Sequence, residues 1–350
     1  MTEHNTSITE HREVLERTAR EIVATGKGIL AADESNGTMD KRLEAAGIEP
    51  GEESRRRFRE VLFTTPGVER QISGVILYDE TLRQAGSDGV PFAESCAARG
   101  IIPGIKVDTG AKPLAGAEGE KVTEGLDGLR ERLEEYRELG ARFAKWRAVI
   151  ALGDGLPSAY AISVNAHALA RYAALCQEAG IVPIVEPEVL MDGDHTMDRS
   201  EQVTGEVLRA VFAELVIQRV ALEGIVLKPN MVLSGYDCPD QASVDEVAQR
   251  TLALLRGVVP PAVPGIAFLS GGQSDELAAA HLSAMNALGG VPWELSFSYG
   301  RALQATPLET WAGDEANHDA AQSGFAHRAY CNGEARSGRY TEQVEHAVAG

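Results

Sequence analysis

The sequence predicts an α/β protein built as a (β/α)8 TIM barrel, and two observations support that prediction. Eight short, mostly apolar runs each end in polar residues, and helical patterns separate several of them. Five of the polar ends recur at intervals of 39, 41, 42 and 42 residues, at Lys106, Lys145, Glu186, Lys228 and Ser270. One strand and one helix fill each interval, which indicates a parallel sheet. Eight such units favour a closed barrel.

The eight predicted strands share an apolar body and a polar end. They cover residues 28–33, 74–79, 101–108, 141–149, 181–188, 224–230, 265–272 and 294–301. Three of the runs contain a proline, at Pro103, Pro183 and Pro264. We place each proline at the start of its strand, because its missing N–H removes no ladder hydrogen bond there.

Helices are predicted between the strands and at both ends of the chain. Apolar side chains recur at three- and four-residue steps from Leu126 to Leu139, which is typical of an amphipathic helix. Longer helices are predicted within residues 158–179, 199–219, 243–259 and 275–288. We expect a single domain over residues 1–350, with a helical extension at 1–25 and a helical tail at 314–350. No Gly-x-Gly-x-x-Gly opens a helix, which disfavours a Rossmann fold.

Composition argues against several classes of partner. The formal net charge is -19, whereas nucleic acids and anionic membranes bind clustered Lys and Arg. No stretch approaches the roughly 18 consecutive apolar residues of a membrane span. The four cysteines are scattered without a Cys-x-x-Cys pair, which disfavours a zinc knuckle or a disulfide framework. Together these features predict a cytoplasmic protein with no export signal.

Charged residues gather at the C-terminal ends of the predicted strands, where barrel enzymes carry their chemistry. Residues two apart on a strand project to the same side. Four pairs have that spacing, and Asp33 ends the first strand: Lys106/Asp108, Lys145/Arg147, Glu186/Glu188 and Lys228/Asn230. A single charged pair is more often solvated, but this many charges on neighbouring strands require one another or a ligand as partners. The cations predict an anionic substrate.

Two glycine-containing segments predict a phosphate site. Residues 270–274, Ser-Gly-Gly-Gln-Ser, follow the seventh strand and precede a helix, so that backbone N–H groups and the helix dipole face the same point. Gly300 and Arg301 end the eighth strand. Ser-Gly-Gly alone is more often a plain turn, but the loops after strands seven and eight are the usual phosphate site of this fold. We therefore favour phosphate.

Seven segments of the chain resemble those of class I fructose-1,6-bisphosphate aldolases. They are residues 26–35, 104–108, 143–147, 182–188, 227–231, 268–274 and 297–304. The resemblance spans nearly the whole chain. It implies a lyase of glycolysis and gluconeogenesis, which reversibly cleaves fructose 1,6-bisphosphate to dihydroxyacetone phosphate and glyceraldehyde 3-phosphate.

The same resemblance implies catalytic roles for five residues. Lys228, one of seven lysines among 33 basic residues, would form a Schiff base with the C2 ketone. Glu186 would shuttle protons while Glu188 holds the network, because two nearby carboxylates can act as acid and base. Asp33 would take the proton of the C4 hydroxyl, and Lys145 would stabilise developing oxyanion charge.

Substrate binding is implied for ten further residues. The first phosphate would bind at Ser270, Gly271, Gly272, Gly300 and Arg301. The second phosphate would bind at Ser35, Thr38, Lys106 and Arg42. Arg147 would help to hold the substrate. The family implies no metal or other cofactor, a small phosphorylated sugar as ligand, and a homotetramer. Two features depart from the family pattern: Thr38 stands where serine is common, and the terminal tyrosine of the animal enzymes has no counterpart after Tyr340.

Three other functions are weighed against this one. A metal-dependent aldolase needs clustered ligands, but the eight histidines form no His-x-His or His-x-x-x-His pair. Another Schiff-base aldolase or a transaldolase would not need two phosphate features. A non-catalytic barrel scaffold could lose Lys228 or Glu186 without harm, and both are present.

Overall fold

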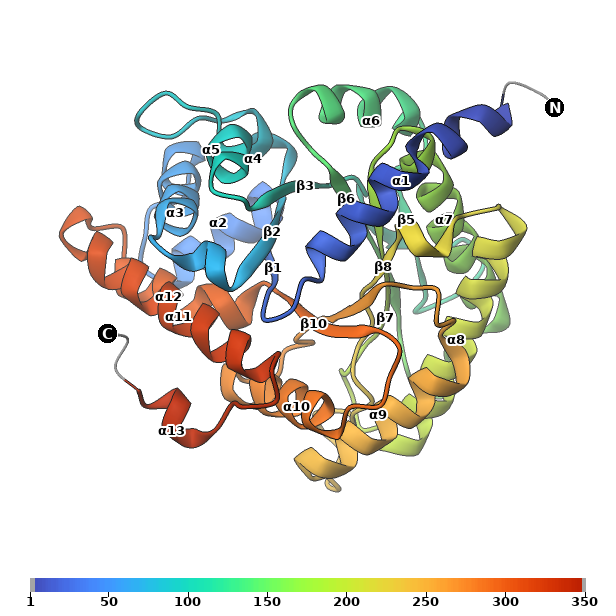
Figure 1. Cartoon of the computed structure of the whole chain (residues 1–350). Coiled ribbons are helices and arrows are strands. Elements are labelled where there is room, and N and C mark those ends of the chain that lie inside the picture. The colour runs from blue at the N-terminus through green and yellow to red at the C-terminus, as the bar shows by residue number, and fades with distance from the viewer. Residues whose placement is uncertain (1–3, 348–350) are drawn as a thin grey trace.

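The computed structural model describes residues 4–347, with side chains from residue 11 onward. Eight parallel strands close into a barrel in the order β1-β10-β9-β8-β7-β6-β3-β2 (Figure 1). They are β1 (Gly28–Ala32), β2 (Ile72–Leu77), β3 (Ile102–Lys106), β6 (Phe143–Ile150), β7 (Val182–Val189), β8 (Val226–Leu227), β9 (Gly265–Phe268) and β10 (Glu294–Tyr299). Each overlaps one predicted strand. The predicted TIM barrel is therefore confirmed.

The three prolines lie where their strands begin. Pro103 and Pro183 are the second residues of β3 and β7, and Pro264 directly precedes β9. The carbonyl oxygen of Pro103 still accepts a hydrogen bond from Arg142 N at 2.8 Å. A proline at the entry of a strand therefore interrupts little of the barrel ladder.

Thirteen α-helices occupy the described part of the chain, most of them around the barrel. They are α1 (His4–Ile22), α2 (Asn36–Ala45), α3 (Glu52–Thr64), α4 (Asp79–Arg83), α5 (Phe92–Ala98), α6 (Leu129–Glu138), α7 (Ala159–Glu178), α8 (Met197–Ile217), α9 (Val244–Val258), α10 (Asp275–Leu288), α11 (Arg301–Trp311), α12 (His318–Ala335) and α13 (Glu342–Glu345). The predicted amphipathic and long helices correspond to α6, α7, α8, α9 and α10. Residues 1–3 and 348–350 of the predicted extension and tail lie outside the described residues. Division into a single domain stays a prediction.

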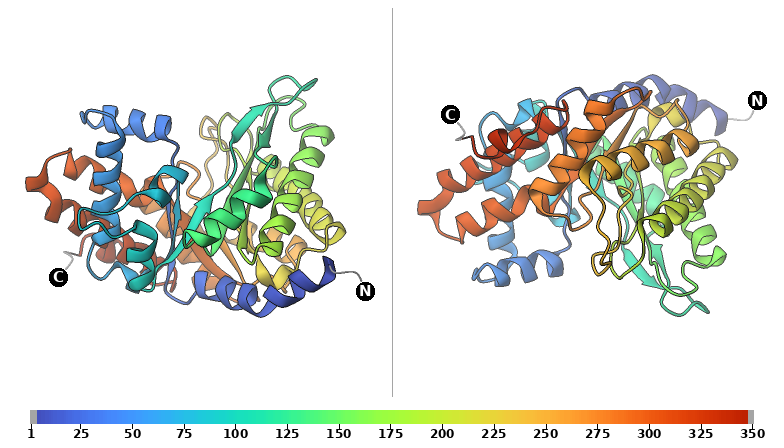
Figure 2. Two further views of the ribbon diagram at one scale, coloured as in Figure 1. Left: turned by 90° about the horizontal axis from the view of Figure 1, so that it is seen from above. Right: turned by 90° about the horizontal axis from the view of Figure 1, so that it is seen from below.

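The N-terminal helix α1 lies across the end of the barrel at which the strands begin (Figure 1 and Figure 2). Leu15, Ala19 and Ile22 share one face of α1 because they are spaced by four and three residues. They pack with interior residues of the barrel, including Phe143 and Val226, in one buried cluster. Burial of a side chain such as Leu15 contributes about 1.5–3 kcal/mol. The helix therefore closes this end with apolar side chains.

Phe143 fills the barrel interior and explains the glycine on the neighbouring strand. A Cβ atom at Gly104 would lie 2.3 Å from the Phe143 ring. Real side chains cannot approach that closely, so any larger residue would displace the ring. The interior is thus a packed core below the charged strand ends.

A hairpin that the sequence analysis did not predict extends the loop after β3. Its antiparallel strands are β4 (Gly110–Pro113) and β5 (Lys121–Glu124). In the left view of Figure 2 the hairpin projects from the side of the barrel opposite α1. Thr123 anchors it, because its hydroxyl donates to the carbonyl oxygen of Arg147 on β6 at 2.7 Å.

Among residues 4–347, no helix has both the length and the apolar character that a membrane span requires.

Candidate active site

A cavity of about 810 Å³ opens at the C-terminal ends of the barrel strands. All fifteen residues that the sequence analysis assigned to the site line it. These are Asp33, Ser35, Thr38, Arg42, Lys106, Lys145, Arg147, Glu186, Glu188, Lys228, Ser270, Gly271, Gly272, Gly300 and Arg301. Residues from different strands therefore meet in one space, as expected for a parallel barrel.

Four buried charges form a continuous chain at the centre of the cavity. Lys228 Nζ lies 3.0 Å from Glu186 Oε1. Lys145 Nζ lies 3.2 Å from Glu186 Oε2 and 2.7 Å from Asp33 Oδ2. Each residue is at most 9% exposed. The chain Lys228, Glu186, Lys145, Asp33 alternates in sign, so each buried charge has an opposite partner.

The barrel strands fix these four side chains. Lys145 and Glu186 sit within β6 and β7, Asp33 directly follows β1, and Lys228 directly follows β8. Lys228 N donates to the carbonyl oxygen of Val185 at 2.8 Å, so the lysine backbone is still held by the neighbouring strand. Reactive groups anchored in this way keep their relative positions.

Electrostatics keep both carboxyls of the chain ionised. Burial alone would raise the pKa of Asp33, but the charges of Lys145 and Lys228 lower it to about 2. Burial opposes ionisation of Glu186 too, and the same two lysines lower its pKa below the ordinary value. Burial would lower the pKa of Lys145, but Asp33 and Glu186 raise it overall. At neutral pH Lys145 is a fixed cation between two carboxylates.

One oxygen of Glu186 has spare hydrogen-bonding capacity. Glu186 Oε2 is buried and, among the described residues, accepts no hydrogen bond of good geometry, although Lys145 Nζ is 3.2 Å away. Buried polar atoms normally have a hydrogen-bond partner. This oxygen is therefore a candidate partner for a substrate hydroxyl or a transferred proton.

Outer charges of the cavity also form pairs. Lys106 Nζ lies 2.6 Å from Asp108 Oδ1 and also donates to the Asp108 carbonyl oxygen at 2.7 Å. Arg147 pairs with Glu188, and its side chain is 43% exposed. Glu188 itself is buried. Arg147 can therefore turn the end of its guanidinium toward a ligand while Glu188 stays paired with its Nε.

Asn230 does not belong to the cavity, although its spacing from Lys228 predicted that both could face the barrel. Its Oδ1 accepts from Val189 N at 3.0 Å, and its Nδ2 donates to Thr204 Oγ1 at 3.1 Å. The prediction is wrong because β8 ends at Leu227, after which strand alternation no longer fixes side-chain direction. Asn230 instead ties β7 to α8.

The first anion-binding region lies between β9 and α10 and at the start of α11. Gly271 and Gly272 have φ angles of 60° and 89°, a left-handed conformation that favours glycine. Gly300 and Arg301 bring the N-terminus of α11 to the same cavity. Backbone N–H groups of such turns and helix starts bind phosphate oxygens.

Tyr236 is a residue of this region that the sequence analysis missed. It lines the cavity, and its hydroxyl donates to the carbonyl oxygen of Gly271. The bond connects the loop after β8 to the glycine turn after β9. Burial raises the pKa of Tyr236 to about 12, so the hydroxyl keeps its proton at neutral pH. No pattern in the sequence distinguishes this tyrosine from the other seven.

The second anion-binding region surrounds the N-terminus of α2. Ser35 Oγ and Thr38 Oγ1 lie 3.0 Å apart, and Ser35 makes no side-chain capping bond. Lys106 and Arg42 line the same cavity. Two hydroxyls, two cations and a helix N-terminus together suit a phosphate.

Glu34, which the sequence analysis also missed, supports this region from behind. It accepts from Arg42 Nη1 at 2.5 Å, from Arg59 Nη2 at 2.8 Å and from Gln304 Nε2 at 2.9 Å. Gln304 Nε2 also donates to the carbonyl oxygen of Ala31 at 2.7 Å, at the end of β1. The segment that carries Asp33 and Ser35 is thereby fixed to α3 and α11.

Fold and site together define a barrel enzyme whose cavity suits a small substrate with two phosphates. Residues 14–350 match the family model for fructose-bisphosphate aldolase class-I. A "probable fructose-bisphosphate aldolase class 1" of Xanthomonas campestris is 58% identical over 94% of this chain and 98% of its own. The fructose-bisphosphate aldolase of Dictyostelium discoideum is 53% identical over 93% and 92%, and aldolase C of Rattus norvegicus 53% over 95% and 92%.

A solved structure agrees with these sequence comparisons. The fructose-bisphosphate aldolase of Plasmodium falciparum, in a complex with TRAP and a small-molecule inhibitor, superposes with a TM-score of 0.94. The two chains are 47% identical, and the superposition covers 95% of this chain and 96% of the Plasmodium falciparum chain. The chain belongs to the class I fructose-bisphosphate aldolase family.

The predicted activity is thereby confirmed: the protein is a fructose-bisphosphate aldolase, a lyase of glycolysis. Membership of class I implies a Schiff-base mechanism without a metal. A transaldolase and a non-catalytic scaffold are not favoured, because the family model and the relatives all indicate aldolase.

Proposed function

We propose that Lys228 is the Schiff-base residue and that the chain Lys228, Glu186, Lys145, Asp33 performs the cleavage of fructose 1,6-bisphosphate. The observation that supports this most strongly is the unbroken sequence of buried contacts at 3.0, 3.2 and 2.7 Å between them. It joins an amine to two carboxylates that the neighbouring lysines keep ionised, and therefore able to accept a proton. Those are the groups that imine formation and deprotonation of a hydroxyl require.

Lys228 and Glu186 carry out the first half of the proposed reaction. Glu186 accepts a proton from Lys228, and the neutral amine attacks the C2 ketone to give a carbinolamine. Glu186 returns the proton to the carbinolamine oxygen, which leaves as water, and a protonated imine remains. Their separation of 3.0 Å permits direct proton transfer in both directions.

Asp33 carries out the second half. Its carboxylate removes the proton of the C4 hydroxyl, the C3–C4 bond breaks, and its electron pair moves into the imine to form an enamine. Glyceraldehyde 3-phosphate leaves. Protonation of the enamine at C3 and hydrolysis of the imine then release dihydroxyacetone phosphate and restore Lys228. Lys145, 2.7 Å from Asp33, stabilises negative charge on the reacting oxygens.

The direction of the substrate follows from the order of these residues. The imine carbon is C2, so the 1-phosphate lies nearest Lys228, and we place it at Ser270, Gly271, Gly272, Gly300 and Arg301. Asp33 acts at C4, and Ser35 and Thr38 follow it along the chain. We therefore place the 6-phosphate at Ser35, Thr38, Lys106 and Arg42. Arg147, supported by Glu188, holds the sugar between them.

Borohydride trapping tests the assignment of Lys228. Dihydroxyacetone phosphate and borohydride should attach one reduced substrate to Lys228, located by peptide mass spectrometry. Lys228→Arg keeps the charge but should abolish trapping, because guanidinium does not form the imine. Lys121→Arg, on the exposed hairpin, is the matched control and should trap normally. An adduct on another lysine, or trapping by Lys228→Arg, would contradict the assignment.

We also propose that the enzyme is a cytoplasmic homotetramer without a metal in its reaction. Family membership and the scattered cysteines support this. Light scattering after size-exclusion chromatography measures the assembly, and a value other than four chains would refute it. EDTA should leave the cleavage rate unchanged, and a loss that added zinc restores, at an unchanged thermal unfolding midpoint, would refute the metal-free reaction.

A further inference from the structure

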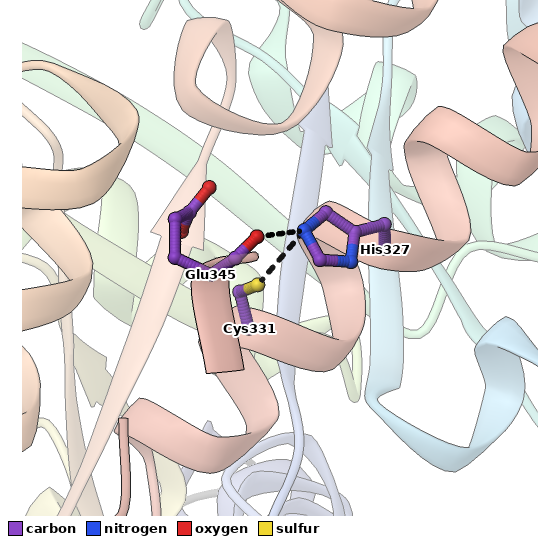
Figure 3. A group of neighbouring side chains, drawn as sticks. All are labelled: His327, Cys331 and Glu345. Carbon is purple, nitrogen blue, oxygen red and sulfur yellow. Dashed lines mark hydrogen bonds between the residues drawn. The ribbon is translucent and has the colours of Figure 1, made fainter. Parts of the chain in front are cut away.

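The end of the described chain packs on α12 through contacts that are separate from the cavity. Tyr340 OH donates to Glu345 Oε2 at 2.6 Å, and Arg328 pairs with the other oxygen of Glu345. His327 Nε2 lies 2.8 Å from the main-chain oxygen of Glu345. These contacts bring α13 against α12. They also place Glu345 beside His327 and Cys331, whose side chains are of the two types that most often bind zinc in proteins (Figure 3).

The spacing of His327 and Cys331 sets them on one face of α12, because residues four apart in a helix are neighbours. Donor atoms of His327, Cys331 and Glu345 all lie within 4.8 Å of one another. His327 Nε2 and Cys331 Sγ are 3.5 Å apart. In a tetrahedral zinc site, nitrogen at about 2.0 Å and sulfur at about 2.3 Å from the ion are also roughly 3.5 Å apart. The two side chains therefore already have the separation of ligands on one ion.

We propose that a divalent cation of the Zn²⁺ type binds His327 Nε2, Cys331 Sγ and a carboxylate oxygen of Glu345, and fixes α13 to α12. The Cys331 thiol releases its proton to solvent as the metal–sulfur bond forms, so no oxidant or reductant is required. Water, or the main-chain oxygen of Glu345, completes four-fold coordination. The site is structural, and none of its three residues lines the catalytic cavity.

The surrounding charges agree with a doubly charged ion. Arg328 Nε is 3.9 Å from Asp275 Oδ2, and Arg328 also pairs with Glu345. With Cys331 as a thiolate, three negative groups surround the guanidinium of Arg328: Asp275, Glu345 and Cys331. Their combined net charge of -2 would be balanced by one divalent cation. Each carboxylate oxygen has more than one acceptor position, so Glu345 can keep Arg328 and Tyr340 while it binds metal.

The environment of Cys331 predicts how binding depends on pH. Its sulfur faces the C-terminal segment, 3.8 Å from the carbonyl oxygen of Val344. A metal ion binds the thiolate form of cysteine, so a proton must leave Cys331 when the metal–sulfur bond forms. The apparent affinity for metal should therefore rise with pH. A site of carboxylates alone would show little such dependence above pH 6, where carboxylates are already ionised.

Cobalt titration of the full chain tests the site directly, with Co²⁺ as a coloured probe. One Co²⁺ per chain should bind with a sulfur-to-cobalt charge-transfer band, which Zn²⁺ then removes. Cys331→Ser and His327→Gln should each lose the band, whereas Cys238→Ser, at a buried cysteine elsewhere, should retain it. Absence of the band in the unaltered protein, or its persistence in Cys331→Ser, would overturn the proposal.

A second measurement tests whether the bound metal fixes α13 to α12, an effect that we call the clamp, or only binds there. It also provides a result for variants that fold poorly. Zn²⁺ should raise the thermal unfolding midpoint and slow proteolysis beside α13 in the unaltered protein, but do neither in His327→Gln. Equal protection in both proteins would refute the clamp. Borohydride trapping at Lys228 in the same samples reports the catalytic site separately, so failure of either proposal is recognisable.

Discussion

Replacing Lys145 by methionine removes the central cation of the buried charge chain and provides a quantitative test of its energetics. The pKa of Asp33 falls from an ordinary 3.8 to about 2, with Lys145 as its strongest favourable partner. At about 1.4 kcal/mol for each tenfold change in ionisation, this favours ionised Asp33 by about 2–3 kcal/mol. Glu186 loses the same partner. Because two carboxylates remain buried without it, we expect Lys145→Met to lower the free energy of unfolding by about 3–5 kcal/mol at pH 7.

Urea unfolding monitored by tryptophan fluorescence measures this loss of unfolding free energy. Arg17→Met is the matched control, since Arg17 and Glu21 form an exposed pair at 4.0 Å whose removal should cost at most about 1 kcal/mol. A double-mutant cycle with Asp33→Asn should give a coupling energy of about 2 kcal/mol. The ionised form of Asp33 stabilises the fold above pH 3.8, and this contribution is lost as pH falls through about 2. A coupling energy near zero, or a loss equal to that of the control, would refute the reasoning.

Three further outcomes are expected. Thr38→Ala should raise KM for fructose 1,6-bisphosphate roughly tenfold through one lost charged hydrogen bond, while Thr38→Ser should not, and neither should affect fructose 1-phosphate. Tyr236→Phe should raise KM several-fold at unchanged kcat, because it frees the Gly271 turn; a lower kcat at unchanged KM would contradict this. Burial lowers the pKa of His281 from 6.5 to about 4, so the unfolded chain binds more protons than the folded one between these pH values. The free energy of unfolding should therefore fall by about 2 kcal/mol from pH 8 to pH 5. Urea unfolding should show a smaller fall in His281→Gln.

The sequence predicts the barrel well because strand ends and side-chain chemistry coincide in this fold. Lys145 and Glu186 sit inside long strands, so their inward direction follows from alternation. Asn230 shows where that reasoning ends: it lies three residues beyond a strand of two residues, and its direction depends on contacts with β7 and α8. Local pattern cannot specify such contacts.

Residues that support the site are the hardest to predict. Glu34 acts through Arg42, Arg59 and Gln304, which are separated from it by 8, 25 and 270 positions. Tyr236 acts on a turn 35 positions away. His327 and Cys331 share a helix face, but a pattern of paired histidines does not detect a mixed pair of histidine and cysteine. Their juxtaposition with Glu345 depends on the path of the chain after α12.

The alternating chain of two lysines and two carboxylates has a consequence for how the enzyme responds to ionic strength. Its formal charge sums to zero, and a proton that moves from Lys228 to Glu186 leaves that sum unchanged. Chemistry inside the buried chain should therefore be nearly indifferent to salt. Substrate capture should depend on salt, because exposed Arg147 and partly exposed Arg42 attract phosphates through solvent. In solvent, about 0.1 M salt screens charges beyond roughly 10 Å. Salt should thus weaken capture of the bisphosphate while leaving turnover of the bound sugar almost unaltered.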